Sequence, residues 1–318
     1  MAGPTTHTDG LREAYDRLLD DPRLRRRYLD VDGQETHLIE IGEGQPLILL
    51  HGTGSPAPFF LPLLRQLSEV RVIAPERPGQ GLSDPIDPYS GDLRALAVTW
   101  LDRLLDALEL ESAPIVGHSM GGLWGLWYAH ARPERISELV VLGGAPALLG
   151  ERVPLPYRVM ATPGLGWLVQ RFAPQTERSV VQFARFMGED TTIVEHPELI
   201  GLLVAAGDDP LTSAAARAEA RMIIAAHALL SPSSFRHSAR LTPDELRQIT
   251  TPTLVIWGKR EPLAGVDVAR DIVGLLPDGR LEVLDAGHGP WLGHAAAIAE
   301  LVREFVQRGS PREGQRHA

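Results

Sequence analysis

The 318-residue sequence contains no cysteine. Disulfide bonds, thiolate metal sites and cysteine nucleophiles are therefore excluded, because each needs a thiol. Lysine is nearly absent too, since Lys259 is the single lysine and arginine carries the other positive charges. With 31 basic and 41 acidic side chains, the formal net charge is −10. Nucleic acid binding needs a concentrated basic surface, so we predict no nucleic acid partner.

Long hydrophobic runs are missing as well. No apolar run approaches the roughly 20 residues that span a bilayer. Residues 1–10 lack the basic-then-apolar pattern of a signal peptide. The hydrophobic fraction of 44% and the charged fraction of 23% are ordinary for a globular protein. We therefore predict no membrane insertion and a cytoplasmic location.

Metal and nucleotide motifs are also lacking. His288 and His294 do not form a His-x-x-x-His pair with a glutamate between them. The glycine-rich stretch Gly79–Gly81 matches neither the G-x-G-x-x-G nor the G-x-x-x-x-G-K pattern. We predict no metal and no cofactor.

Apolar strands alternate with helical segments through most of the chain. The Asp32-Gly33 pair predicts a hairpin between strands 26–31 and 35–41. This alternation predicts an α/β fold with a mostly parallel sheet and helices on both faces. Further strands are expected at 47–51, 70–74, 113–116, 139–142, 253–257 and 279–284, and helices at 11–22, 59–68 and 92–109.

The alternation stops between about 147 and 238, where helical segments are separated by prolines. Expected helices there are 155–171, 176–187, 197–206 and 212–230. The predicted division of the chain is an N-terminal extension and helix (1–25), a core (26–146 and 239–310), a helical segment (147–238) and a tail (311–318).

The pentapeptide Gly117-His118-Ser119-Met120-Gly121 directly follows the short apolar strand 113–116. A G-x-S-x-G sequence between a strand and a helix is typical of a nucleophile elbow, a turn so sharp that its neighbours must be small. Gly117 and Gly121 meet that steric demand. Ser119 is therefore the predicted nucleophile.

A serine nucleophile needs a base and an acid that orients the base. His288 lies on a glycine-flanked loop after the last strand, and Glu261 lies in the turn after strand 253–257. We predict His288 as the base and Glu261 as the acid, with Asp267 and Asp285 as alternatives for the acid. The order Ser119, Glu261, His288 is the order of nucleophile, acid and base in α/β-hydrolases.

Four stretches resemble the α/β-hydrolase fold superfamily, in its serine-triad branch with a lid. The resemblance implies that the backbone amides of Thr53 and Met120 form the oxyanion hole. It also implies that the segment 147–238 is a helical lid over Ser119. The family more often has aspartate where this chain has Glu261. The four stretches are 47–54, 72–84, the elbow 117–121, and the loops of Glu261 and His288.

The apolar side chains of the expected lid are candidates to line a substrate pocket, the alternative being that they pack the lid onto the core. They are Met160, Trp167, Phe172, Phe183, Phe186 and Met187. We expect a small-molecule substrate with an apolar part. His51 and His118 are predicted to be structural or supporting residues, and the oligomeric state is not predicted.

The predicted function is a serine hydrolase that cleaves small to medium carboxylic esters through an acyl-enzyme. One alternative is a carbon–carbon bond hydrolase acting on β-diketones or ring-fission products. Another is a non-catalytic ligand-binding protein of this fold. Epoxide hydrolases and haloalkane dehalogenases are disfavoured, because these relatives place an aspartate where Ser119 stands.

Overall fold

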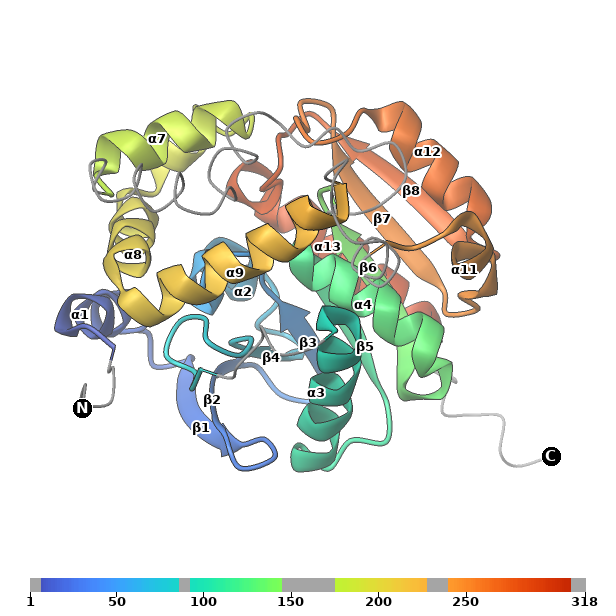
Figure 1. Cartoon of the computed structure of the whole chain (residues 1–318), viewed down its shortest axis with the longest axis horizontal. Helices are drawn as coiled ribbons and strands as arrows, with labels where there is room; N and C mark the ends of the chain where they lie inside the picture. Colours follow the sequence, from blue (N-terminus) through green and yellow to red (C-terminus); the bar gives the residue numbers. More distant parts are fainter. Residues whose placement is uncertain (1–6, 86–91, 145–174, 228–239, 310–318) are drawn as a thin grey trace.

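The computed structural model describes residues 7–85, 92–144, 175–227 and 240–309 (Figure 1). The helix expected at 155–171 lies outside these ranges, and so do Met160, Trp167, Phe172 and the expected tail 311–318. The boundaries at 146, 147 and 238 fall outside them too.

The predicted hairpin is present near the N-terminus. Strand β1 (Arg25–Asp30) pairs antiparallel with β2 (Glu35–Ile41). The turn between them has positive φ angles at Asp32 (59°) and Gly33 (83°). Two successive positive φ angles match the right-handed twist of the flanking strands, which is why Asp-Gly is favoured there.

The hairpin continues into one eight-stranded sheet with the order β1-β2-β4-β3-β5-β6-β7-β8. Strand β2 pairs antiparallel with β4, and all pairs from β4 to β8 are parallel. The predicted α/β fold with a mostly parallel sheet is confirmed. The remaining strands are β3 (Pro46–Leu50), β4 (Arg71–Pro75), β5 (Ala113–His118), β6 (Ile136–Leu142), β7 (Thr253–Gly258) and β8 (Gly279–Leu284).

The helices expected at 11–22, 59–68 and 92–109 are present with different ends. Helix α1 (Asp9–Leu18) begins earlier than expected, because the Thr8 side chain caps it by accepting from the Leu11 amide at 3.4 Å. The helix expected at 59–68 is divided into η1 (Ala57–Phe60) and α2 (Leu61–Gln66). The others are α3 (Leu93–Ala107), α4 (Met120–Ala131), η2 (Pro133–Arg135), α11 (Pro243–Gln248), α12 (Val266–Leu275) and α13 (Trp291–Gly309).

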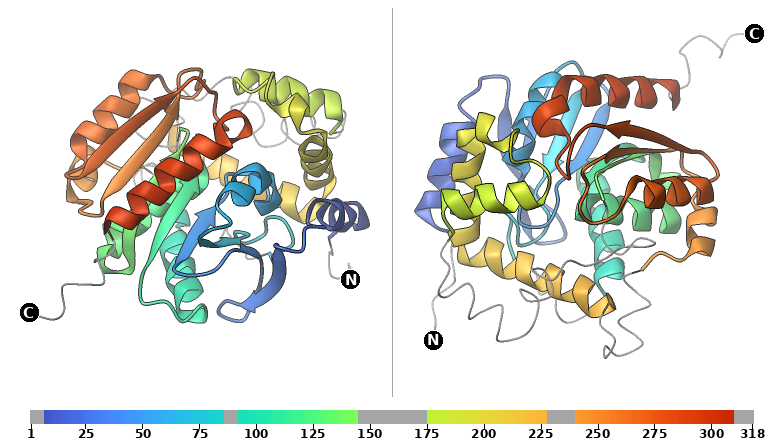
Figure 2. Two further views of the ribbon diagram at one scale, coloured as in Figure 1. Left: turned by 180° about the vertical axis from the view of Figure 1, so that it is seen from behind. Right: turned by 90° about the horizontal axis from the view of Figure 1, so that it is seen from above.

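Alternate residues of the central strands enter two separate apolar clusters. In β3, Ile48 and Leu50 belong to the cluster with α3, α4, α11 and α12, whereas Leu47 and Leu49 belong to the cluster with α1, α2 and α13. Figure 1 shows α3 and α4 in front of the sheet, and the left view of Figure 2 shows α13 and α2 on the opposite face. Because both faces are covered, these strands are apolar at successive positions rather than at every second one.

The chain between β6 and β7 is helical wherever the structure describes it. We call residues 175–227 the helical insertion. It contains α7 (Glu177–Phe186), η3 (Ile193–Glu195), α8 (Pro197–Asp208) and α9 (Pro210–His227), and no strand occurs in it. Within the described ranges no single helix meets the length and hydropathy needed to span a membrane, although α8 and the first part of α9, bent by 83°, meet them together.

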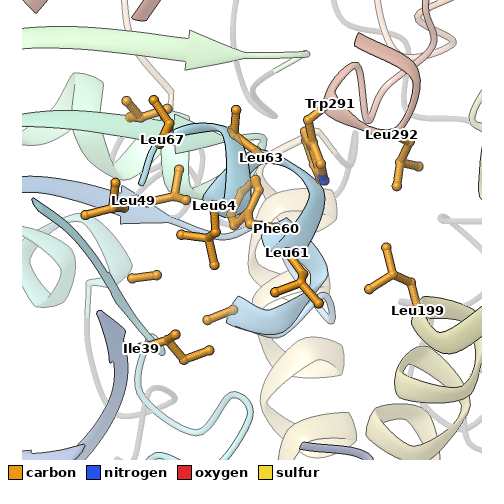
Figure 3. Packing of buried hydrophobic residues seen from close by; sticks show 14 of the residues in the cluster. Ile39, Leu49, Phe60, Leu61, Leu63, Leu64, Leu67, Leu199, Trp291 and Leu292 are labelled. Carbon is orange, nitrogen blue, oxygen red and sulfur yellow. The ribbon is translucent and has the colours of Figure 1, made fainter. Parts of the chain in front are cut away.

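One apolar cluster joins the insertion to the core. Figure 3 shows Leu199 of α8 facing α2, with Trp291 and Leu292 of α13 close by. All three side chains are buried. Helix α13 begins three residues after His288, so this cluster links the insertion to the chain that carries the predicted base.

Candidate active site

Ser119 lies between β5 and α4 with a strained backbone. Its φ of 51° and ψ of −113° are unusual for a residue with a side chain. The strain is held by hydrogen bonds on both sides: the Ser119 amide donates to Leu142 of β6 at 3.1 Å, and its carbonyl accepts from Leu123 at 3.0 Å. This is the geometry that a nucleophile elbow requires.

The glycines of the elbow are required by close backbone contacts. A Cβ atom at Gly117 would lie 2.4 Å from the Gly121 carbonyl oxygen. A Cβ atom at Gly121 would lie 2.4 Å from the carbonyl oxygen of Leu50, at the end of β3. Any larger residue would push the elbow away from the turn that follows β3.

His288 is hydrogen bonded to Glu261. His288 Nδ1 and Glu261 Oε2 are 2.7 Å apart, and the Glu261 side chain is fully buried. The same carboxylate accepts from the amides of Gly144 at 2.8 Å and Leu263 at 3.0 Å. Gly144 follows β6 and Glu261 follows β7, so the carboxyl ends of adjacent parallel strands bring these groups together.

This surrounding keeps Glu261 ionised. Burial by itself raises the pKa of Glu261, but His288 and the hydrogen bonds from Gly144 and Leu263 outweigh it and lower the pKa below its ordinary value. The alternatives for the acid lie elsewhere. Asp285 is exposed and pairs with Arg260, and Asp267 is exposed at the start of α12.

The turn after β3 lies beside Ser119. A Cβ atom at Gly52 would be 3.3 Å from Ser119 Cβ and 2.7 Å from His118 Nδ1. Thr53, one expected oxyanion donor, follows Gly52, and Met120, the other, is the first residue of α4. Amides in the first turn of a helix have no partner within the helix and lie at the positive end of its dipole. The two predicted donors therefore come from adjacent backbone segments.

His51 and His118 are both buried and neutral. Burial and the nearby Arg77 lower the pKa of His51 to about 3. Its Nδ1 donates to the Gly52 carbonyl at 2.8 Å, and its Nε2 accepts from the Arg77 amide at 2.9 Å. Burial and His288 lower the pKa of His118 well below its ordinary value. His118 Nε2 donates to the His288 carbonyl at 3.1 Å, so it supports the histidine loop.

The arrangement of strands and site residues can be compared with known proteins. A family model described as alpha/beta hydrolase fold matches residues 45–295, which is most of the chain. The chain belongs to the alpha/beta hydrolase fold family. The predicted site residues lie on the loops at the ends of β3, β5, β7 and β8 of this α/β-hydrolase.

Known relatives of this α/β-hydrolase are hydrolases. It is 28% identical over 299 residues to a 2-hydroxy-6-oxononadienedioate/2-hydroxy-6-oxononatrienedioate hydrolase of Pseudomonas putida, covering 90% of this chain and 95% of the relative. It is 29% identical to a pimeloyl-[acyl-carrier protein] methyl ester esterase of Shewanella woodyi, covering 86% and 98%. Among solved structures, carboxylesterase CesB of Bacillus subtilis superimposes with a TM-score of 0.75 at 25% identity, covering 95% of this chain and 99% of that one. The chain is thus a hydrolase.

Trp291 packs beside the candidate site, and the sequence patterns did not single it out. Its Nε1 donates to the Phe59 carbonyl at 3.1 Å. The centroid of its ring lies 4.6 Å from the ring centroid of Phe60 and 4.5 Å from that of His118. Trp291 therefore joins the histidine loop of this α/β-hydrolase to the elbow and to the helix that follows the turn of Thr53. An aromatic residue three positions after His288 was the available signal.

Glu219 of α9 was also missed, because nothing near it in the sequence indicates its partners. Its carboxylate forms a buried ion pair with Arg77 and accepts from the Thr53 hydroxyl at 2.6 Å. Arg77 Nε donates to the carbonyl of His51 at 3.0 Å, and the guanidinium lies over the Trp124 ring at 4.9 Å. The helical insertion is thereby attached to the turn of Thr53.

Small residues allow α9 to approach that closely. A Cβ atom at Gly79 would lie 2.9 Å from Ala215 Cβ, and one at Gly54 would lie 3.6 Å from Ala216 Cβ. Ala215 and Ala216 precede Glu219 by four and three residues, so each lies on the same face of the helix as Glu219. In the chain as far as the structure describes it, no group of three or more histidine, aspartate or glutamate side chains could hold a metal ion.

Phe183 and Phe186, two of the expected pocket residues, are 51% and 37% exposed on α7, whereas Met187 is buried. Their assignment to a substrate pocket stays a prediction.

Proposed function

We propose that the chain is a serine hydrolase that breaks a bond to a carbonyl carbon. Ser119 is the nucleophile, His288 the base, Glu261 the acid, and the backbone amides of Thr53 and Met120 the oxyanion hole. The observation that carries this proposal is the buried hydrogen bond of 2.7 Å between Glu261 and His288, at the same sheet edge as the strained Ser119.

The proposed roles follow from the hydrogen bonds. Ionised Glu261 accepts from Nδ1–H of His288, which leaves Nε2 of the ring as the basic atom. Nε2 takes the proton of the Ser119 hydroxyl as the oxygen attacks the carbonyl carbon. The negative charge that develops on the carbonyl oxygen is stabilised by the two amides, each worth about 3 kcal/mol in comparable sites. His288 then donates its proton to the leaving group, and water completes the hydrolysis.

We infer that the bond broken is a carbon–carbon bond of a ring-fission product. The Pseudomonas putida relative hydrolyses a 2-hydroxy-6-oxo dienedioate, and the C6 ketone of that compound is bound only to carbon. Its hydrolysis therefore breaks a carbon–carbon bond. The C6 carbonyl carbon gains the oxygen of water and becomes a carboxylate, while the electron pair of the C5–C6 bond passes to C5, which takes a proton. From the sequence, ester hydrolysis was the first expectation and carbon–carbon cleavage the alternative, so this choice reverses their order.

Ester hydrolysis is the second candidate. The relative from Shewanella woodyi is a methyl ester esterase, and the matching Bacillus subtilis structure is a carboxylesterase. A second observation also favours esters. A dienedioate carries two carboxylates that a cation could bind, but the guanidinium of Arg77 is already engaged by Glu219 and His51 and is not available to them. The same chemistry then ends with an alcohol as the leaving group. In either case the helical insertion serves as the lid of the site.

The test is to assay the purified protein with a 2-hydroxy-6-oxo dienoate and with p-nitrophenyl esters of graded acyl length, using Ser119→Ala as the blank. Much faster turnover of the dienoate supports carbon–carbon cleavage, and the reverse supports ester hydrolysis. Activity that persists in Ser119→Ala, or a wild type that no fluorophosphonate labels at Ser119, would overturn the proposal.

A further inference from the structure

Glu189 is a buried acidic residue of the helical insertion that the proposed reaction does not use. It lies three residues after the end of α7, and the preceding Gly188 has a φ of 76°. The Gly188 amide donates to Arg185 at 3.1 Å, and the Glu189 amide donates to Ala184 at 2.8 Å. These two hydrogen bonds form a Schellman motif, which ends the helix and turns the chain sharply. The turn brings residues 187–189 against the loop of His288.

Three successive amides of the histidine loop donate to this turn. Gly287 and Gly289 donate to Glu189 Oε1 at 2.8 and 3.1 Å. Between them, the His288 amide donates to the Met187 carbonyl at 2.9 Å. A run of backbone amides that point to one side favours an anion. The carboxylate of Glu189 supplies that anion from a segment about 100 residues away in the sequence.

The contact between this turn and the histidine loop leaves no space for a side chain at Gly287 or Gly188. A Cβ atom at Gly287 would lie 2.2 Å from the Met187 carbonyl oxygen, and one at Gly188 would lie 3.1 Å from Gly287 Cα. Glu189 is only 2% exposed, and its Oε2 accepts from the Thr192 hydroxyl at 2.5 Å. The carboxylate is thus held in one orientation at both oxygens.

Two buried glutamates therefore act on the same histidine. Glu261 orients the ring through Nδ1, whereas Glu189 holds the backbone on either side of it. His118 completes the support by donating to the His288 carbonyl. We propose that Glu189 is a positioning residue, through which the helical insertion fixes the loop of His288 in its working geometry. This inference rests on the proposed role of His288 as the base.

The test compares Glu189→Gln, Glu189→Asp and Glu189→Ala, with exposed Glu195→Ala in the same insertion as the matched control. Glutamine keeps an acceptor oxygen at the same reach, aspartate keeps the charge but is one methylene too short, and alanine removes both. A displacement of about 1 Å can cost about 100-fold in rate. We therefore expect kcat to fall by roughly 10- to 100-fold in the Asp and Ala variants, with KM changed by less than about threefold. The Gln and Glu195→Ala variants should stay close to wild type.

A second measurement does not depend on turnover. Amide hydrogen exchange of residues 286–289 should become faster in Glu189→Ala and Glu189→Asp, and stay slow in Glu189→Gln. Unchanged exchange in the Ala variant, or a Gln variant as impaired as Ala, would overturn the role of Glu189. Failure of a fluorophosphonate to label wild-type Ser119 would instead overturn the proposed function, so the two failures are separable.

Discussion

The helical insertion contacts two sides of the proposed active site through two buried glutamates, and their environments differ. On the side of the proposed oxyanion hole, which we call the oxyanion side, Glu219 faces the guanidinium of Arg77 and the hydroxyl of Thr53. On the histidine side, Glu189 accepts from the amides of Gly287 and Gly289 and from the Thr192 hydroxyl, and none of its hydrogen-bond partners among the described residues is a cation. An ion pair and a set of backbone dipoles thus perform the same task of attachment.

This difference matters because a buried charge needs compensation. A guanidinium supplies a full opposite charge, and its removal leaves the buried carboxylate without a partner. Amide dipoles compensate only in part, so burial still raises the pKa of Glu189 in spite of Thr192, the amides of Gly287 and Gly289, and Arg260. The two attachments should therefore respond differently to mutation.

The largest effect is expected from Glu261→Gln, which tests the histidine side at the ring rather than at the backbone. Loss of the charge removes the group that fixes the tautomer of His288, and kcat should fall by about 10⁴-fold with the fold intact. Steady-state kinetics and circular dichroism measure this. In the controls Asp267→Asn and Asp285→Asn, kcat should stay near wild type. A comparable loss in either control would move the role of the acid to that residue.

Next in size is Arg77→Met on the oxyanion side. It leaves Glu219 buried without its guanidinium, so the free energy of unfolding should drop by about 3–5 kcal/mol in urea titrations. Adding Glu219→Gln should restore part of that loss, because the uncompensated charge is then gone. Arg270→Met, at an exposed arginine of α12, is the control and should change stability little. An Arg77→Met protein as stable as wild type would show that the ion pair is not needed.

Thr192→Val and Thr53→Val form a matched pair, since each removes a hydroxyl that donates to one of the two glutamates. Hydrogen bonds to charged groups contribute about 1.5–3 kcal/mol to stability, and Thr192→Val should lower the free energy of unfolding by that amount. Thr53→Val should cost only about 1 kcal/mol, because Arg77 still compensates Glu219. Urea titration of both variants measures the difference. Equal losses would remove the distinction between the two attachments.

The smallest effect is the pH dependence that Glu189 adds to stability. Because its pKa is raised above the ordinary 4.5, the folded protein binds this proton more tightly than the unfolded chain does. Ionisation of Glu189 therefore costs stability above its folded pKa, and that cost disappears as the pH falls toward 4.5. Glu189→Gln should thus gain stability relative to wild type at neutral pH, and the gain should shrink in acid. A gain that grows in acid would contradict the raised pKa.

Much of the fold and part of the site were predictable because their signals are local. The Asp32-Gly33 hairpin and the alternation of apolar strands with helices depend on neighbouring residues, and both were confirmed. The elbow is similar. A Cβ atom at Gly117 would clash with the backbone of Gly121, which belongs to the same short turn. The helix ends were less predictable, as α1 shows, because the Thr8 cap depends on a single side chain.

Local patterns in the chain were enough to predict the sheet, the elbow around Ser119 and the candidates His288 and Glu261, because backbone sterics and hydrophobic periodicity act over a few residues. Which carboxylate meets which partner depends instead on contacts between segments that are far apart in the chain. Glu189 lies 98 positions from Gly287, and Glu219 lies 142 positions from Arg77. Burial and close packing of the helical insertion select these pairs, and neither leaves a periodic pattern in the chain.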